Sequence, residues 1–345
     1  MPAPLISGIS ILMCCHNSAG RLDFSLKHLA ALDVPDGLAV ELVLVDNAST
    51  DQTRTVAEQF WANHGRPFPL IVLQEPRLGL SYARMTGIMA AHHDYVLSCD
   101  DDNGMPPAYL RQLVDILRRL ASYRPQIAML GGQGVPLFET TPPRWALQFH
   151  MFGCGPQGPQ SGPVNQLYGA GSLIFRPAFM RLYHAGFRWL LTDRQGTHLS
   201  SGGDYELCGA FRAAGYALWY EEELRFWHFI PAQRLSITYY QQFIREASEA
   251  ENILLLYRAL PALSRFPSWL IRWLAFREAI YHLKQILILI FRSLRQSADL
   301  QQLQQLRIAY HRKRIFQLLH ISQTHQHNWP QLISWYQKLT SGKTG

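Results

Sequence analysis

The sequence contains no uninterrupted apolar stretch of about 18 residues, the length that a helix needs to cross a bilayer. We therefore expect no transmembrane helix in its 345 residues. The apolar run Leu5–Cys15 has no Lys or Arg before it and no small-residue cleavage site after it, so it predicts a strand rather than a signal peptide. Internal repeats and low-complexity segments are missing as well. These absences leave an ordinary globular chain.

Cysteine is scarce and odd in number: the chain has five, Cys14, Cys15, Cys99, Cys154 and Cys208, and no pair is spaced as CxxC. Three of them lie in apolar runs that are typical of buried strands. This usage argues against a disulfide framework. We expect free thiols and a reducing compartment such as the cytoplasm.

Charge is also sparse, at 17% of residues against 48% hydrophobic, and it is unevenly distributed. From Leu260 to the end the chain has 12 Lys and Arg but only two Asp and Glu, whereas the preceding part is slightly acidic. A basic tail attracts polyanions, either nucleic acid or an acidic membrane surface. No RNA-binding motif or aromatic interleaving is found, so we expect no nucleic-acid partner.

The first 131 residues alternate between short apolar runs and helical patterns. Three of the runs, ISILMCC, LVLVD and YVLSC, are apolar throughout, which indicates strands buried on both faces of a parallel sheet. An α/β doubly wound unit follows from this alternation. The expected strands are Ile9–Cys15, Val40–Asp46, Leu70–Gln74, Tyr95–Cys99 and Ile127–Gly131. The expected helices are Arg21–Ala31, Asp51–Ala62, Ser81–Ala91 and Pro107–Leu120.

The remainder is less regular at first and then almost wholly helical. Gly131–Asn165 is rich in Gly and Pro and predicts a surface excursion. Further strands are expected at Tyr168–Arg176, Ala217–Tyr220 and Phe226–Ile230, and helices from Pro177 and at Asp204–Ala214. We divide the chain into a domain of residues 1–235, with halves 1–131 and 132–235, and a basic helical region of residues 236–345.

Polar side chains follow the expected strands at their carboxyl ends, where ligands bind in open parallel sheets. The segment Cys99–Asn103, CDDDN, places three carboxylates together, and like charges at that distance raise each other's pKa. A hard cation such as Mg²⁺ or Mn²⁺ is the natural partner. Asp100 and Asp102 would point the same way if the segment is extended. Alternatively, the three carboxylates lie in a solvated loop before a helix N-terminus, and Ser49–Asp51 could merely cap another helix.

Several segments together resemble the family 2 glycosyltransferases, which have the GT-A fold. They occur in the family's order over residues 9 to about 231. The segments are ISILMCCHN, ELVLVDNASTDQT, EPRLGLSYARMTGI, YVLSCDDDN, YGAGSLIFRPAF, SGGDYELCGAFRAAGYALWY and FWHFIP. The resemblance implies a doubly wound, mostly parallel sheet with flanking helices, to which this chain adds a C-terminal helical extension.

The resemblance also implies roles for individual residues. Those placed at the nucleotide-sugar donor are Cys15, His16, Asn17, Asp46, Arg84, Asp100 and Asp101. Among them, Asp46 would contact the nucleobase and Asp100 would lie near the ribose. Asp102 matches the metal-binding aspartate of the DxD motif, and His228 matches a histidine that closes over the metal or diphosphate. Asp204 matches the general base, which would take a proton from an acceptor hydroxyl.

Some positions depart from the family pattern. The first strand ends in Cys14–Asn17 where the family usually has Pro-x-Tyr-Asn. Gly203 stands before Asp204 in place of the usual Glu, which leaves Glu206 as a second candidate base. Asp204 could also be only a helix N-cap, and His228, beside aromatic residues, only a core residue.

The function implied is metal-dependent transfer, using Mg²⁺ or Mn²⁺, of a sugar from a nucleotide-diphosphate donor to a hydroxyl of a saccharide or lipid-linked saccharide. We expect an inverting, non-processive enzyme of surface polysaccharide or glycoconjugate synthesis, because a processive synthase would need transmembrane helices and a QxxRW motif. One alternative is a sugar nucleotidyltransferase, although CCHNSAG lacks the Gly-rich triphosphate loop with Arg and Lys. Another is a non-catalytic binding or scaffold protein, although the aspartates are intact.

The tail contains a long helix candidate, Trp269–Gln296. Its basic residues Arg277, Lys284, Arg292 and Arg295 share one face, and its apolar residues Trp273, Leu283, Ile286, Leu287 and Ile290 lie largely elsewhere. This pattern favours a helix that lies on the anionic inner face of a membrane. The alternative is a helix packed on the main domain with a solvated basic face.

Overall fold

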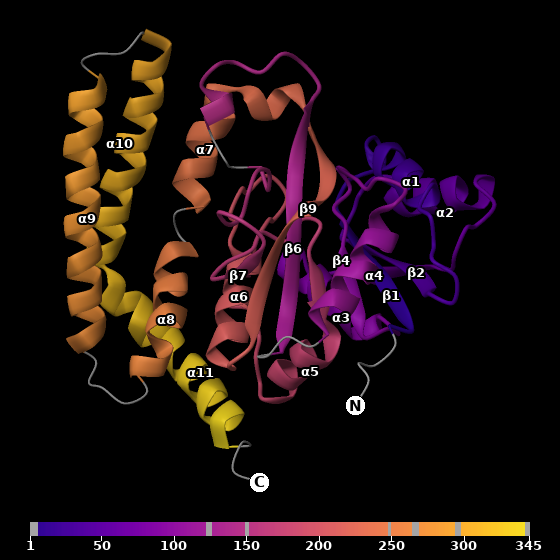
Figure 1. Ribbon diagram of the computed structural model, residues 1–345. Helices are drawn as coiled ribbons and strands as arrows, with labels where there is room; N and C mark the ends of the chain where they lie inside the picture. Colours follow the sequence, from indigo (N-terminus) through magenta and orange to yellow (C-terminus); the bar gives the residue numbers. More distant parts are fainter. Residues whose placement is uncertain are drawn as a thin grey trace.

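The computed structural model describes residues 6–121, 126–148, 152–247, 250–263, 269–293 and 298–341. Its described strands form one sheet in the order β3-β2-β1-β4-β8-β6-β9-β5, with β7 paired to β9. Helices cover both faces of this sheet, and the C-terminal helices extend to one side of it (Figure 1). The α/β class is confirmed, and so is the helical C-terminal extension.

The N-terminal half of the sheet is parallel, as the uninterrupted apolar runs predict. The strands are β1 (Gly8–Cys15), β2 (Ala39–Asn47), β3 (Leu70–Glu75) and β4 (Tyr95–Ser98). The helices between and after them are α1 (Leu22–Ala30), α2 (Thr53–Asn63), α3 (Leu80–Ala90) and α4 (Tyr109–Leu120). The register between β1 and β2 ends with Cys15 opposite Asp46, so the polar loops after both strands meet at one edge.

The second half of the sheet is mixed rather than parallel. β8 (Leu173–Phe175) runs antiparallel to both β4 and β6 (Ile127–Phe138). β6 is parallel to β9 (Ala217–Ile230), and the short strands β5 (Asn103–Gly104) and β7 (Gly162–Val164) pair antiparallel with β9.

Four expected strands in this half of the sheet have other limits in the structure. The two strands expected at 217–220 and 226–230 are one strand, because a register shift after Gly131 accommodates the residues between them. The first residues of the expected excursion belong to β6, where a Cβ on Gly132 would lie 2.1 Å from the carbonyl oxygen of Leu224. The strand expected at 168–176 is shortened because Gly171, at φ +63°, turns the chain before β8.

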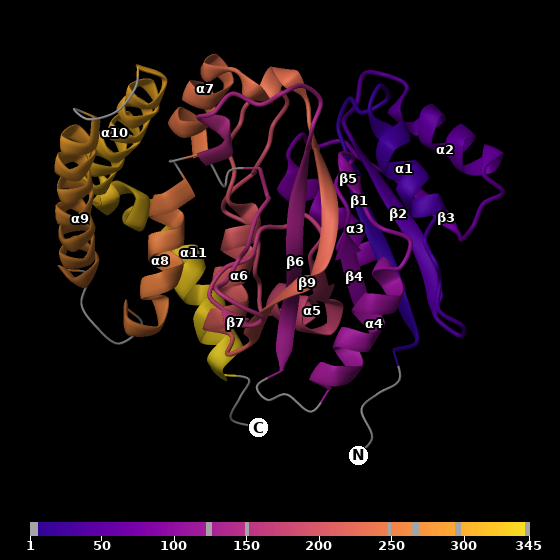
Figure 2. The same cartoon turned by 45° about the horizontal axis from the view of Figure 1, so that its top comes forward.

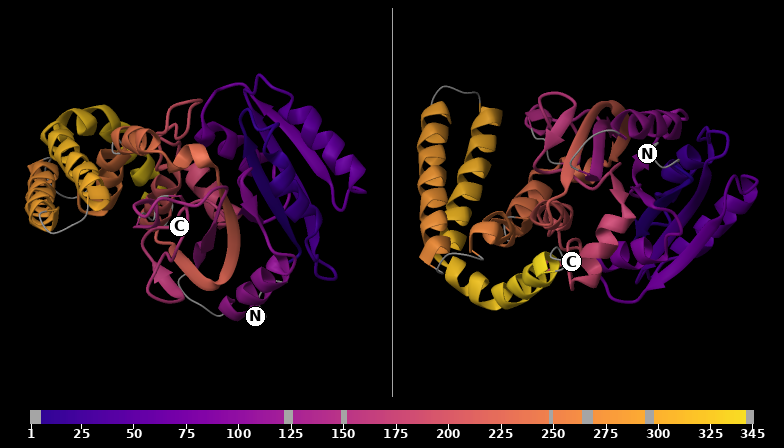
Figure 3. Two further views of the ribbon diagram at one scale, coloured as in Figure 1. Left: turned by 90° about the horizontal axis from the view of Figure 1, so that it is seen from above. Right: turned by 60° about the horizontal axis from the view of Figure 1, so that its bottom comes forward.

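The remaining helices are α5 (Arg176–His184), α6 (Gly203–Ala213), α7 (Ile237–Ala247), α8 (Ala250–Leu263), α9 (Trp269–Ser293), α10 (Ala298–Leu319) and α11 (Ile321–Ser341). Two short 3-10 turns are η1 (Ala146–Gln148) and η2 (Ala232–Leu235). α9 and α10 form a hairpin on the side of the molecule away from α2, and α8 and α11 lie between this hairpin and the sheet (Figures 1 and 2). The two further views show the same arrangement (Figure 3).

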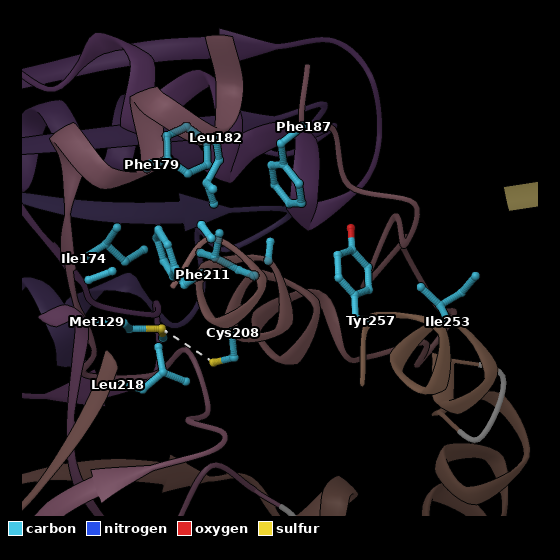
Figure 4. Close-up of a cluster of buried hydrophobic side chains, with 14 of the residues drawn as sticks. Met129, Ile174, Phe179, Leu182, Phe187, Cys208, Phe211, Leu218, Ile253 and Tyr257 are labelled. Atoms are coloured by element: carbon cyan, nitrogen blue, oxygen red, sulfur yellow. Dashed lines mark hydrogen bonds between the residues drawn. The ribbon is translucent and has the colours of Figure 1, made fainter. Parts of the chain in front are cut away.

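The tail is attached to the sheet domain by a shared core. Phe179 of α5 and Phe211 of α6 belong to one buried cluster with Ile253 and Tyr257 of α8 (Figure 4). Gly209 makes this contact close, since a Cβ there would lie 2.9 Å from the Cβ of Tyr257. Within the residues that the structure describes, no helix is long and apolar enough to cross a membrane.

Candidate active site

The loops after β1 and β2 bind each other at the edge of the sheet. His16 Nδ1 lies 2.8 Å from the carbonyl oxygen of Asn47. Asn17, at φ +49°, accepts a hydrogen bond of 2.8 Å from the backbone N–H of Thr50. Asp46 is buried, and one of its carboxylate oxygens accepts the N–H of Ser49 at 3.3 Å. His16, Asn17 and Asp46 are therefore neighbours, as expected of residues that line one pocket.

Cys15 lies at the same edge, but its side chain points into the core beneath the loops. Burial raises the pKa of this thiol well above its usual value, so it stays neutral. The other four cysteines are also unpaired, as expected. Cys15 can offer a ligand its backbone, and the packing of its thiol supports the loop from below.

Asp101 faces a different direction from its two neighbours. Its carboxylate accepts a hydrogen bond from the Ser18 hydroxyl and one of 2.8 Å from Nε of Arg21. These contacts fasten the loop after β4 to the start of α1. The donor-binding role predicted for Asp101 has no direct support in this arrangement, and a structural role accounts for its burial.

Asp100 and Asp102 lie in a turn rather than in an extended segment, so the argument from strand alternation was wrong. The N–H of Asn103 donates to the carbonyl oxygen of Asp100 at 3.0 Å and closes the turn. The two carboxylates are nevertheless electrostatic neighbours: burial, reinforced by the charge of Asp102, raises the pKa of Asp100 to about 6. Two buried carboxylates that repel each other are a place where an added cation is stabilised.

Strand pairing brings His228 to Asp102. β5 and β9 pair with Asn103 opposite His228, and the N–H of Phe229 donates to the carbonyl oxygen of Asp102 at 2.8 Å. His228 Nε2 consequently lies 3.2 Å from a carboxylate oxygen of Asp102. Burial opposes the charged imidazolium, but Asp102 raises the pKa of His228 to about 10. This contact makes His228 a charged partner of Asp102 and not a histidine packed among aromatic residues alone.

Arg234 of η2 completes this group, and no sequence pattern pointed to it. Its guanidinium lies 3.0 Å from the second carboxylate oxygen of Asp102. Burial alone would favour a neutral acid, yet His228 and Arg234 hold the pKa of Asp102 well below its usual range. The only signal in the sequence is an arginine shortly after the last strand, at the carboxyl edge where ligands bind.

A second charged group surrounds Arg84 of α3. Its guanidinium lies 2.9 Å from the carboxylate of Asp193, a buried residue at φ +58° that sequence analysis did not single out. Burial opposes the charge of Arg84, but Asp193, Asp204 and Asp100 together raise its pKa. The positive charge of Arg84 therefore interacts both with Asp100 of the DxD segment and with Asp204, the proposed base.

Asp204 is the second residue of α6, and Gly202 occupies the N-cap position of this helix. The carboxylate of Asp204 accepts the backbone N–H of Gly169 at 2.6 Å instead of capping its own helix. A Cβ on Gly169 would lie 2.9 Å from a guanidinium nitrogen of Arg84, so glycine allows the backbone to enter this group. The N-cap alternative for Asp204 was therefore wrong.

Glu206, the second candidate base, is placed elsewhere. Its side chain is fully buried and accepts the N–H groups of Leu190 and Leu191 at 2.8 and 2.9 Å and the Tyr257 hydroxyl at 2.9 Å. A carboxylate with three such donors and no exposed surface cannot meet an acceptor. Its role is to join α6, the loop after α5 and α8.

Comparison with known proteins bears on the family and the fold. Residues 10–136 match the family profile described as Glycosyl transferase family 2. Over this part, the chain is similar to the family 2 glycosyltransferases. The matched segment runs from β1 into β6 and contains Asp46, Arg84 and Asp100–Asp102, whereas Asp204 and His228 lie beyond its end.

Among curated relatives, poly-beta-1,6-N-acetyl-D-glucosamine synthase of Staphylococcus epidermidis is 29% identical over 97 residues, 28% of this chain. The chain covers 22% of the length of that relative. Among solved structures, the mannosyltransferase PcManGT from Pyrobaculum calidifontis, in complex with GDP-Man and Mn²⁺, matches with a TM-score of 0.53 and 16% identity over 96% of this chain and 86% of its own. S. aureus TarS in complex with UDP-GlcNAc matches with a TM-score of 0.49 and 16% identity over 72% of this chain and 66% of that one. The likeness to the mannosyltransferase supports the fold.

Proposed function

We propose that this protein transfers a sugar from a nucleotide-diphosphate sugar to a hydroxyl group of an acceptor. The observation that carries the proposal is the position of Asp204: its carboxylate is held by the Gly169 N–H and lies next to Arg84, which in turn interacts with Asp100. A base, a cation and a DxD segment at one edge of a GT-A sheet are the parts that this reaction requires. The family 2 match favours sugar transfer over nucleotidyl transfer.

The donor nucleotide would lie over the loops after β1 and β2. Asp46 and the neighbouring His16 and Asn17 would supply polar groups for the base, and Asp100 would lie near the ribose. The mannosyltransferase structure contains GDP-Man, which makes a guanosine donor one of the candidates to test.

The residues around Asp102 fit a divalent metal in part. In the described parts of the chain, no three His, Cys, Asp or Glu side chains form a cluster that could hold a metal alone. Mg²⁺ and Mn²⁺ are commonly held by one or two carboxylates and the phosphates of the substrate, and the mannosyltransferase structure contains Mn²⁺. Asp102 would be the protein ligand, with His228 beside it.

When bound, the metal would offset the negative charge of the departing diphosphate. Arg234 and His228 of the chain supply further positive charge beside Asp102. Arg234 and a protonated His228 both contact Asp102 and are therefore available to the diphosphate when the carboxylate turns to a cation. Positioned cations of this kind lower the energy of a leaving group whose charge grows in the transition state.

The chemical step is a single displacement. Asp204 takes the proton of the acceptor hydroxyl, the hydroxyl oxygen forms a bond to the anomeric carbon, and the bond from that carbon to the diphosphate oxygen breaks. The configuration at the anomeric carbon is inverted because attack and departure occur on opposite faces. Asp193 acts as a positioning residue, since its ion pair keeps Arg84 from binding Asp204 directly.

We further propose that the enzyme is non-processive and cytoplasmic, that it serves surface polysaccharide or glycoconjugate synthesis, and that its acceptor is a saccharide or a lipid-linked saccharide. The basic tail supports work at the inner face of a membrane. One curated relative is a poly-beta-1,6-N-acetyl-D-glucosamine synthase, which supports the polysaccharide assignment.

The test begins with the donor. UDP-, GDP- and dTDP-sugars are screened for thermal stabilisation of the protein with and without Mn²⁺, because a ligand of the folded state raises the melting temperature. The stabilising donor is then incubated with candidate saccharides, and nucleotide diphosphate release and the anomeric configuration of the product are measured. Stabilisation by no donor, or a product of retained configuration, would contradict the proposal.

A further inference from the structure

Helix α9 has two apolar faces on opposite sides. The inner face contains Ile271, Ala275, His282, Ile286 and Leu289, which are buried, and the neighbouring helices are α8, α10 and α11. Ile286 therefore does not belong to the exposed apolar surface, contrary to the sequence prediction, and Arg295 lies outside the described residues. A helix that only packed on its neighbours would need the inner face alone.

The second face is what we call the outer stripe. It consists of Trp269, Trp273, Phe276, Ile280, Leu283, Leu287 and Ile290, spaced alternately by four and three residues. This spacing keeps all seven on one side of an α-helix. Their side chains are 40% to 65% exposed. Soluble surfaces carry single exposed apolar residues routinely, but a continuous row of this size marks an interaction site.

The margins of the outer stripe are basic. Arg272 lies on one side of it, Arg277 and Lys284 lie on the other, and all three are exposed. The guanidinium of Arg277 lies 5.1 Å from the centre of the Trp273 ring. Glu278, the acidic residue of the described helix, points away from the stripe toward Arg258, to which it is paired at 3.5 Å.

We propose that the outer stripe is a membrane-docking surface, which lies in the interface of an anionic bilayer with the axis of α9 parallel to the membrane. An apolar row with tryptophans and flanking cations is the composition of helices that lie in this region. Anionic headgroups would contact Arg272, Arg277 and Lys284, while the aromatic and aliphatic side chains enter the acyl boundary. α9 lies at the outer edge of the molecule, so the sheet domain would not obstruct this contact (Figures 1 and 3).

A second copy of the chain is the competing occupant, because the same spacing is found in coiled coils. Charge argues against it. In a two-helix coiled coil the residues at the margins of one stripe face those of the other. Here both margins are basic, so a parallel or an antiparallel pair would place Arg and Lys against Arg and Lys. An anionic lipid surface neutralises these charges, whereas a second copy doubles them.

The experiment is flotation of the full-length protein with vesicles of phosphatidylcholine, with and without phosphatidylglycerol. The wild type is expected to float with the anionic vesicles and much less with the neutral ones, and added salt should release part of it. Phe276→Glu should lower partitioning by more than about tenfold, because a phenyl ring that enters the acyl boundary of the bilayer is replaced by a charge. Arg277→Gln and Lys284→Gln should each lower it about fivefold.

The matched control is Leu147→Glu, which introduces the same charge at a position of similar exposure, 61% against 65% for Phe276, in η1. It should float like the wild type. Sedimentation without lipid is measured for the same set of proteins. If the wild type is a dimer that Phe276→Glu dissociates, and if it does not float with vesicles, the outer stripe is an interface between two copies of the chain and not a membrane-docking surface. Equal flotation of Phe276→Glu and wild type, or no dependence on phosphatidylglycerol, would also overturn the proposal. None of these outcomes depends on glycosyl transfer.

Discussion

The guanidinium of Arg84 and the carboxylate of Asp193 form an ion pair of 2.9 Å in the interior, with side chains only 11% and 4% exposed. Gly203 makes room for this pair, since a Cβ there would lie 2.8 Å from the same carboxylate. A buried charge is stable only when it is paired, so each member of this pair depends on the other. The carboxylate beside Arg84 thus comes from Asp193 and not from the residue preceding Asp204.

Asp193→Asn should therefore affect the activity of the general base Asp204 as well as the free energy of unfolding. Without the carboxylate, Arg84 is free to approach Asp204 and pair with it, which would withdraw the base from the acceptor, so kcat should fall. Loss of one partner of a buried ion pair should also lower the free energy of unfolding by about 3 kcal/mol. Both are measured on one preparation, by initial rates across pH and by denaturant titration.

A double variant provides the control. In Asp193→Ala the space beside Gly203 is empty, so adding Gly203→Glu should return a carboxylate to Arg84 and restore part of the rate. Gly203→Glu alone should be worse than wild type, because its side chain meets Asp193. If the double variant is no better than Asp193→Ala alone, the charge beside Arg84 is not what the site requires.

Asp204→Asn should bind the donor as the wild type does and lose transfer by about 10²-fold or more, because an amide cannot accept the acceptor's proton. Donor binding is followed by thermal shift and transfer by product formation. Wild-type transfer by this variant would mean that another group is the base. Glu206 could not be that group, since it has no exposed surface.

Asp102→Ala should abolish the dependence of donor binding on Mn²⁺, and treatment of the wild type with EDTA should stop transfer. Arg234→Ala is the informative companion, because it removes the cation on the second oxygen of Asp102. We expect it to weaken donor binding while the response to Mn²⁺ remains. Full activity of the wild type in EDTA would assign the charge-offsetting role to Arg234 and His228 alone.

Glu206 should make stability depend on pH. Burial raises its pKa in the folded protein to about 7 from 4.5, so the folded state binds the proton more tightly than the unfolded state. Its contribution to stability is fully present below pH 4.5 and is lost as pH rises through about 7, a change of about 3 kcal/mol.

Glu206→Gln is neutral at every pH, so this part of the pH dependence should disappear. Its unfolding free energy should also be lower overall at acidic pH, since an amide nitrogen then faces a backbone N–H of Leu190 or Leu191. The measurement is the free energy of unfolding of both proteins between pH 4.5 and 8. Parallel curves would show that Glu206 does not titrate in this range.

The local sequence pattern was sufficient to predict much of the structure of residues 1–131. β1, β2 and β4 are apolar throughout, and such runs are stable only when a sheet buries both faces, so their place in a covered sheet and the polar loops at their carboxyl ends follow from sequence. The same holds for the helical character of the tail and for the helix that contains Asp204. Strand limits failed where glycine decided them, at Gly132 and Gly171, because a residue without Cβ allows both a close contact and a turn.

Contacts between distant segments were decided by tertiary structure alone. Asp102 meets His228 because β5 pairs with β9, and Arg234 joins them from a short turn with no periodic pattern. Asp193 lies in an irregular loop at positive φ, where sequence carries little information about direction. The two faces of α9 could be told apart only after α8, α10 and α11 covered one of them. Sequence thus determined which residues carry charge and which segments are apolar, whereas the fold decided which charges are paired and which apolar face stays exposed, because pairing and burial depend on three-dimensional proximity.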